Sequence, residues 1–198
     1  MSNDLDKNYW ENKYTQNKTG WDIGHASPPI IEYFNQIVNK DLAILIPGAG
    51  NSYEAEYLYQ AGFKNIDVLD IAAQPLMNFK KRVPSFPEKQ LIQGDFFRHN
   101  KKYDLIIEQT FFCAINPETR GLYAKKMANL IKDGGKLVGL LFDFPLTEEG
   151  PPFGGSIKSY KNIFSEFFQI NTLEPCYNSI KPREKRELFI IFEKKNKQ

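Results

Sequence analysis

Short apolar runs alternate with amphipathic stretches along most of the chain. Apolar residues three or four positions apart predict helices, which span residues 4–14, 28–38, 51–61, 72–82, 117–132 and 156–168. The apolar runs between them predict buried strands, at residues 42–47, 66–69, 90–93, 103–108 and 136–142. Because strands and helices alternate, the pattern predicts a doubly wound α/β fold with a mostly parallel sheet.

The last two predicted strands interrupt this alternation. Residues 169–173 and 187–192 are predicted as the last strands, and a loop containing Asn178, Ser179, Lys181 and Pro182 connects them. With no helix to carry the chain back across the sheet, we expect an antiparallel pair at one edge. The sequence therefore predicts one seven-stranded sheet whose last strand is antiparallel. A chain of 198 residues fits a single domain over residues 1–198, with residues 1–40 as a helical cap over a ligand.

The stretch that ends at Asp70 combines a strand, a glycine-containing turn, a helix and a second strand. Gly48 and Gly50 let the backbone approach a ligand closely, and the start of the following helix offers unpaired N–H groups. Asn51 and Glu54 have the spacing of a capping box at that helix start. Asp70 follows the glycines at the distance where a carboxylate can accept from ribose hydroxyls. We therefore expect a cofactor that contains a nucleoside.

In an open α/β sheet the ligand lies beyond the carboxyl ends of the strands. The residues that this rule brings together are Gly48, Gly50, Asp70, Asp95, Gln109 and Phe142. The full G-x-G-x-x-G pattern of dinucleotide sites is incomplete, because Tyr53 stands at the third glycine position. Asp95 offers a carboxylate to an exocyclic amine, and Phe96 offers an aromatic wall to a purine. These features favour S-adenosylmethionine (SAM) over NAD, and an NAD-linked oxidoreductase is the alternative.

Composition narrows the range of partners. The formal net charge is +2 and the pI is near 8.4, which is too weakly basic to argue for nucleic acid or an anionic membrane. No apolar run approaches the roughly 20 residues of a membrane span, and the N-terminus is polar. Two cysteines do not make a disulfide framework. We expect a cytoplasmic monomer that acts on a small molecule and holds no metal.

Five motifs follow one another between Tyr9 and Phe192. They are Trp21-Asp22-Ile23-Gly24, Ile46-Pro47-Gly48-Ala49-Gly50, Asp95-Phe96-Phe97, Phe112-Cys113-Ala114-Ile115-Asn116-Pro117-Glu118-Thr119-Arg120 and Gly150-Pro151-Pro152-Phe153. Together they resemble the thiopurine/thiol methyltransferase family, and especially its thiol and halide branch. The resemblance covers nearly the whole chain. It implies the seven-stranded fold of class I SAM-dependent methyltransferases.

The resemblance also implies roles for single residues. The aromatic positions that enclose SAM from the N-terminal side are matched by Trp10, Tyr14 and Trp21. The positions that contact other parts of SAM are matched by Gly48, Asp70, Asp95, Phe96 and Gln109. Arg120 matches a position expected to hold an anionic or electron-rich substrate, although an arginine in a first helical turn also suits a surface salt bridge.

The chain departs from the family pattern near the expected substrate. Tyr14 stands where plant halide enzymes have Trp, and Gln109 and Phe142 stand where they have Tyr. The resemblance therefore implies SAM binding more strongly than halide use.

Methyl transfer is an in-line displacement at a sulfonium methyl group, and aromatic faces attract such a cation by about 0.5–2 kcal/mol each. An anionic nucleophile needs positioning and exclusion of water rather than a dedicated base. The sequence shows no Ser-His-Asp grouping and no metal cluster. We therefore predict a SAM-dependent methyltransferase for a small thiol or another soft nucleophile, such as sulfide, a thiopurine, halide or thiocyanate.

Two further alternatives stay open. An O- or N-methyltransferase would need a positioned base, for which His25 and Asp22 are the candidates. A non-catalytic SAM-binding protein would bind the cofactor without turnover. Cys113 suits a small buried residue better than a nucleophile.

Overall fold

The computed structural model describes residues 5–196, so residues 1–4 and 197–198 of the predicted domain lie outside the described part. The α-helices are α1 (Lys7–Thr15), α2 (Pro28–Asn35), α3 (Tyr53–Gln60), α4 (Ala73–Arg82), α5 (Arg120–Leu130) and α6 (Ile157–Phe164). The strands are β1 (Ile44–Pro47), β2 (Ile66–Asp70), β3 (Leu91–Gln93), β4 (Tyr103–Gln109), β5 (Ile131–Phe142), β6 (Phe168–Pro175) and β7 (Glu187–Lys194).

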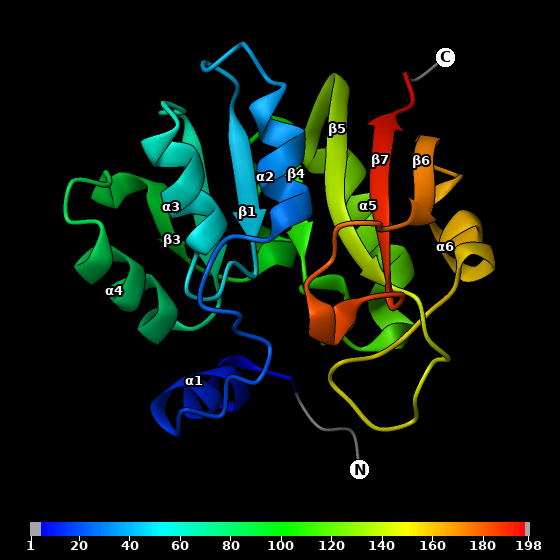
Figure 1. Ribbon diagram of the computed structural model, residues 1–198, viewed down its shortest axis with the longest axis horizontal. Helices are drawn as coiled ribbons and strands as arrows, with labels where there is room; N and C mark the ends of the chain where they lie inside the picture. The colour runs from blue at the N-terminus through cyan, green and yellow to red at the C-terminus, as the bar shows by residue number, and fades with distance from the viewer. Residues whose placement is uncertain (1–4, 197–198) are drawn as a thin grey trace.

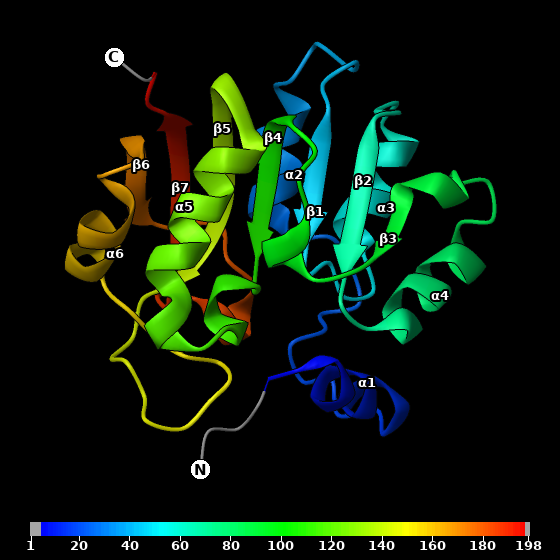
Figure 2. The same cartoon turned by 180° about the vertical axis from the view of Figure 1, so that it is seen from behind.

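These strands form one sheet in the order β3-β2-β1-β4-β5-β7-β6 (Figures 1 and 2). The strands from β1 to β5 pair in parallel. β7 is antiparallel to both of its neighbours, β5 and β6. The predicted doubly wound sheet with an antiparallel last strand is therefore confirmed.

Helices cover both faces of the sheet, and alternation along each strand decides which helices a side chain meets. On β1, Ile44 and Ile46 join the apolar cluster of α2, α3 and α4, whereas Leu45 joins the cluster of α5 and α6. On β4, Leu105 and Ile106 divide between the two clusters in the same way. Because both faces are buried, the central strands are continuous apolar runs.

The helix α1 lies beyond the carboxyl ends of the parallel strands, apart from the two helical layers (Figures 1 and 2). Asp6 caps this helix by accepting from the Tyr9 amide at 2.8 Å. Glu11 accepts from the Ala73 amide at 3.0 Å, at the start of α4. The first helix is therefore joined to the sheet layer through the N-terminus of α4.

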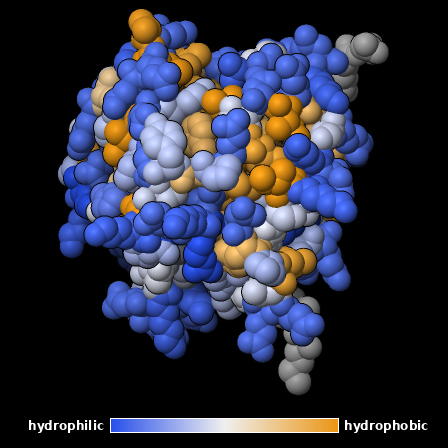
Figure 3. Space-filling view, turned by 45° about the vertical axis from the view of Figure 1, so that its right-hand side comes forward, coloured by the Kyte–Doolittle hydropathy of each residue, from blue (hydrophilic) through white to orange (hydrophobic). Residues whose placement is uncertain are grey.

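The face shown in Figure 3 is mostly hydrophilic, with apolar residues gathered in smaller groups. Within residues 5–196, no helix has the length and apolar character needed to cross a membrane. Cys113 and Cys176 are both free thiols.

The start of α3 differs from the prediction. Ser52 occupies the N-cap position with φ of 62°, and its hydroxyl donates to the Gly50 carbonyl at 3.0 Å. Glu54 accepts instead from the buried amide of Ser27 at 3.0 Å, and Asn51 donates to the loop before α2. The predicted capping box is therefore wrong, because both side chains form hydrogen bonds with residues that precede β1.

The limits of α5 also differ from the prediction. Pro117–Thr119 forms a 3-10 turn, and the α-helix begins only at Arg120. β5 already begins at Ile131, which pairs with Tyr103 of β4. Gly134, with φ of 72°, therefore lies inside an irregular part of the strand instead of capping a helix.

Gly139 lies in the middle of β5, where a Cβ would be 1.9 Å from the Glu108 carbonyl oxygen of β4. That oxygen belongs to the central sheet and has little freedom to move. We expect Gly139→Ala to lower the free energy of unfolding by about 3 kcal/mol, as measured by urea denaturation. Gly121→Ala is the control, because a Cβ at that position in α5 meets no heavy atom within 4 Å. Equal stabilities of the two variants would contradict this account.

Candidate active site

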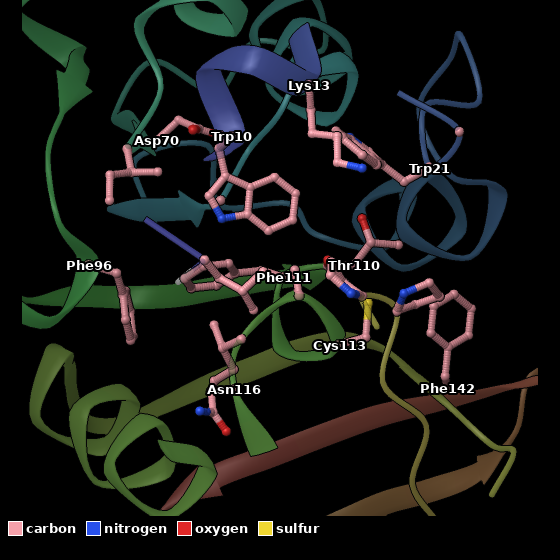
Figure 4. Close-up of a pocket in the computed structure, with 18 of the residues that line it drawn as sticks. Trp10, Lys13, Trp21, Asp70, Phe96, Thr110, Phe111, Cys113, Asn116 and Phe142 are labelled. Atoms are coloured by element: carbon pink, nitrogen blue, oxygen red, sulfur yellow. The ribbon is translucent and has the colours of Figure 1, made fainter. Parts of the chain in front are cut away.

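A cavity of about 870 Å³ opens at the carboxyl ends of the parallel strands (Figure 4). The turns that follow β1 to β4 form one wall, and α1 with the loop behind it forms another. The loops after β5 and before β7 complete the enclosure. Ligand sites usually occupy about 300–1,000 Å³, so this cavity has room for a cofactor and a small second ligand.

Three aromatic side chains form the N-terminal wall of the cavity. Trp10 and Tyr14 are one helical turn apart on α1, so they share a face. The ring of Trp21 meets both edge-on, with centroid distances of 5.5 Å to Trp10 and 5.7 Å to Tyr14. Burial, together with the charge of Asp70, raises the pKa of the Tyr14 hydroxyl well above its usual range. All three predicted aromatic residues therefore line the cavity, and they form one cluster.

The two glycines after β1 have different surroundings. Both have positive φ, 57° at Gly48 and 53° at Gly50. A Cβ on Gly48 would lie 2.2 Å from the Phe111 ring, and one on Gly50 would lie 3.2 Å from the Tyr14 hydroxyl. Gly48 lines the cavity, as predicted, whereas Gly50 lies behind the lining. Glycine is therefore required here by the turn and by neighbouring rings.

Asp70, at the end of β2, lines the cavity and is 6% exposed. Its Oδ2 accepts from the Gly50 amide at 3.0 Å, and its Oδ1 accepts from the Ala72 amide at 2.9 Å. Burial raises the pKa of this carboxyl to about 6, and the nearby charge of Glu11 adds to the increase. Each carboxylate oxygen retains accepting capacity for a ligand hydroxyl.

Asp95 and Phe96, in the turn after β3, also line the cavity. Asp95 caps this turn by accepting from the Phe97 amide at 2.8 Å. Phe96 is buried and meets the Phe111 ring edge-on, with the centroids 5.2 Å apart. Asp95 is therefore both a turn-forming residue and a wall of the cavity.

Gln109 and Arg120 do not line the cavity, although the sequence predicts a cofactor contact for the first and a substrate contact for the second. The Gln109 Oε1 atom is buried and has no hydrogen-bond partner among the described residues. Arg120 is buried and donates to the carbonyl oxygens of Gly154 at 2.8 Å and Phe153 at 3.1 Å. Its guanidinium lies 4.5 Å from the centroid of the Phe112 ring. Arg120 therefore fixes the loop that borders the cavity, and it is neither a surface residue nor a lining residue.

The turn after β4 contains lining residues that the sequence prediction missed. Thr110 adopts φ of 59°, and Phe111 follows it into the cavity wall. Buried Glu108 holds this turn, because its Oε1 accepts from the amides of Phe111 and Phe112, both at 2.8 Å. Tyr123 donates to the other oxygen of Glu108. The sequence feature that could have revealed this turn is an acid near the end of an apolar strand, Glu108, with two aromatic residues, Phe111 and Phe112, shortly after it.

The candidate bases His25 and Asp22 and the candidate nucleophile Cys113 are not placed to take a proton from a substrate or to attack it. His25 contacts the neighbouring Ala26 carbonyl, and Asp22 accepts from the Gly24 amide and from the Asn51 side chain. Neither residue lines the cavity. Burial raises the pKa of the Cys113 thiol far above its usual range, so this lining cysteine stays protonated.

The lining residues fit SAM: the carboxylate of Asp70 suits a ribose, Phe96 suits a purine, and the ring cluster at Trp21 suits a sulfonium. The fold matches that of Burkholderia thailandensis 1,6-didemethyltoxoflavin-N1-methyltransferase, crystallised with 1,6-didemethyltoxoflavin and S-adenosylhomocysteine. The TM-score is 0.77 at 12% identity, over 96% of this chain and 87% of that chain. This likeness shows the fold of class I SAM-dependent methyltransferases.

The family follows from the sequence matches. The model of the thiopurine S-methyltransferase (TPMT) family matches residues 5–197, so the chain belongs to this family. Similar proteins include probable thiol methyltransferase 2 of Arabidopsis thaliana, 30% identical over 159 residues, which are 78% of this chain and 70% of that protein. Thiocyanate methyltransferase 1 of Brassica oleracea is 28% identical over 184 residues, 90% of this chain and 81% of that protein. The resemblance inferred from the motifs is confirmed, and the NAD-linked alternative is wrong.

The position of Arg120 makes a testable distinction between support of the loop and contact with substrate. We expect Arg120→Met to lower the free energy of unfolding by about 1–3 kcal/mol, because two carbonyl oxygens lose their buried partner. Lys125→Met is the control, since Lys125 is an exposed residue of the same helix. Urea denaturation and acceptor KM should be measured together. Unchanged stability with a raised acceptor KM would instead indicate a direct substrate contact.

Proposed function

We propose that this enzyme transfers the methyl group of SAM to the sulfur of a small thiol. The observation that carries the proposal is the composition of the cavity wall, which contains eight aromatic side chains and no histidine among the described lining residues. A thiol with a pKa near 8.5 is a few per cent ionised at pH 7. Solvent can therefore supply the thiolate, and the site needs no base. The names of the plant relatives support the same chemistry.

Bound SAM supplies an electrophilic sulfonium methyl group. In this proposal Asp70 accepts from the ribose hydroxyls, and Asp95 and Phe96 border the adenine. Trp10 and Trp21, whose rings meet within the N-terminal wall, stabilise the sulfonium cation. The helix α1 and the loop held by Arg120 keep water from the reacting atoms. The proposal assigns no contact to Gln109, which does not line the cavity.

No observation favours oxygen or nitrogen as the acceptor atom. Such an acceptor would need a positioned base, and both sequence candidates lie outside the cavity lining. The two free thiols support a cytoplasmic location.

The test is incubation with isotopically labelled SAM and a panel of sulfide, small thiols, a thiopurine, iodide and thiocyanate. Volatile and soluble methylated products are both measured. We expect methyl transfer to at least one thiol. Tight SAM binding without any methylated product would instead support a non-catalytic SAM-binding protein.

The pKa of Asp70 predicts how SAM binding depends on pH. Burial raises this pKa to about 6, whereas hydrogen bonds from ribose hydroxyls favour the ionised carboxylate. The SAM dissociation constant should therefore be lowest above about pH 7 and rise as the pH falls below about 6, approaching tenfold per pH unit. Isothermal titration calorimetry measures this dependence directly.

Asp70→Asn is the matched variant for the same measurement, because it keeps an oxygen for the backbone but cannot ionise. We expect its dissociation constant to be at least about tenfold higher at neutral pH and to lose the pH dependence below about 6. Identical pH profiles for the two proteins would remove Asp70 from the cofactor site.

Trp21 tests whether ring faces contact the sulfonium. Trp21→Ala should raise the SAM dissociation constant more than Trp21→Phe does, since phenylalanine keeps an aromatic face. Fluorescence or calorimetric titration gives both constants. Equal losses for the two variants would argue against a ring-face contact.

A further inference from the structure

The two ends of the cavity differ in charge. The carboxylates among its lining residues, Asp70 and Asp95, both belong to the end that follows β2 and β3. Asp70 and Phe96 lie at one side of the cavity, and Cys113 and Phe142 lie at the other (Figure 4). This second end is aromatic and basic, and it is the end left for the methyl acceptor once SAM occupies the first.

Arg183, one of the two arginines at the acceptor end, already has partners. Its guanidinium forms an ion pair with buried Glu187 at 3.4 Å and donates to the Trp21 carbonyl at 2.7 Å. Only 11% of its side chain is exposed. Arg183 therefore joins the N-terminal aromatic wall to the start of β7, and its charge is already balanced.

Arg186 differs from Arg183. It is exposed and lines the cavity, and none of the ion pairs among residues 5–196 involves it. Its guanidinium lies 4.7 Å from the centroid of the Phe144 ring. Its backbone is fixed on both sides, because its amide donates to Arg183 at 3.0 Å and its carbonyl accepts from Asp143 at 2.7 Å. Arg186 is therefore the arginine of the acceptor end that has no ion-pair partner among the described residues, whereas the other lining cations outside ion pairs, Lys13 and Lys18, belong to the N-terminal wall.

The apolar surface beside Arg186 is suited to a flat molecule. The rings of Phe142 and Phe144 lie next to each other, with centroids 5.2 Å apart. Phe144 is held in place because its carbonyl accepts from the Gly155 amide at 2.8 Å. A guanidinium fork matches a carboxylate in geometry and charge. The acceptor end thus combines an aromatic surface with a carboxylate-binding group.

We propose that Arg186 binds a carboxylate on the acceptor, so that a thiol carrying this group is preferred over its neutral counterpart. The proposal rests on the thiol methylation proposed above. The thiol loses its proton to solvent, and the thiolate sulfur forms a bond to the methyl carbon. The bond from that carbon to the sulfonium sulfur breaks, and its electron pair stays on the sulfur of S-adenosylhomocysteine. The carboxylate takes no part in the bond changes, so Arg186 is a specificity-determining residue.

The test compares 3-mercaptobenzoate with 3-mercaptobenzamide, which have similar shape and differ in charge. The kcat/KM of each thiol is measured for the wild-type enzyme and for Arg186→Gln. We expect the variant to lose at least about fivefold more kcat/KM with the acid than with the amide, mainly through KM. Comparing the two losses cancels the difference in reactivity between the two thiols.

Lys185→Gln is the matched control, because it removes one positive charge from the same loop at a residue outside the cavity lining. It should leave the ratio of acid to amide unchanged. The thermal midpoint and the SAM dissociation constant of Arg186→Gln should equal those of the wild type, which confirms that the variant is folded.

The outcomes separate this inference from the proposed function. Equal losses with both thiols, or an equal effect of Lys185→Gln, would overturn the role of Arg186. Turnover of other thiols in the panel, but not of 3-mercaptobenzoate, would overturn the acidic acceptor while thiol methylation stands. Absence of transfer to every thiol would overturn the proposed function itself.

Discussion

The shape of the active site depends first on the carboxylate of Asp70. Its oxygens accept from the Gly50 and Ala72 amides, so one side chain joins the turn after β1 to the start of α4. Burial of this charge is unfavourable, as its pKa of about 6 indicates, and the two backbone hydrogen bonds offset part of that cost. Because the same carboxylate borders the cavity, a group that holds the backbone is also placed to accept from a ligand.

A similar arrangement supports the other side of the cavity. Glu108 holds the amides of the turn after β4, and Arg120 holds two carbonyls of the loop after β5. These charged groups lie behind the lining, and their hydrogen bonds with the backbone fix the segments that carry the lining residues. Eight aromatic side chains line the cavity. In our proposal these rings stabilise a sulfonium and exclude water, which suits attack by a soft nucleophile.

The fold could be predicted because strands buried on both faces are continuous apolar runs and because the last two strands have no helix between them. The exact ends of the helices could not be predicted. The side chains expected to cap α3, Asn51 and Glu54, form hydrogen bonds instead with residues of the segment before β1. At the end of β4 a shift of one position decides which side chain faces the cavity, and Thr110 lines it where Gln109 was expected. The partners of Arg120 lie more than 30 residues further along the chain, so no local pattern reveals them.

The most direct measurement is a crystal structure of the enzyme with S-adenosylhomocysteine. The account predicts ribose oxygens within hydrogen-bonding distance of the Asp70 carboxylate, the adenine against Phe96, and the sulfur beside the rings of Trp10 and Trp21. A ligand bound outside this cavity, or inside it with the ribose away from Asp70, would contradict the account.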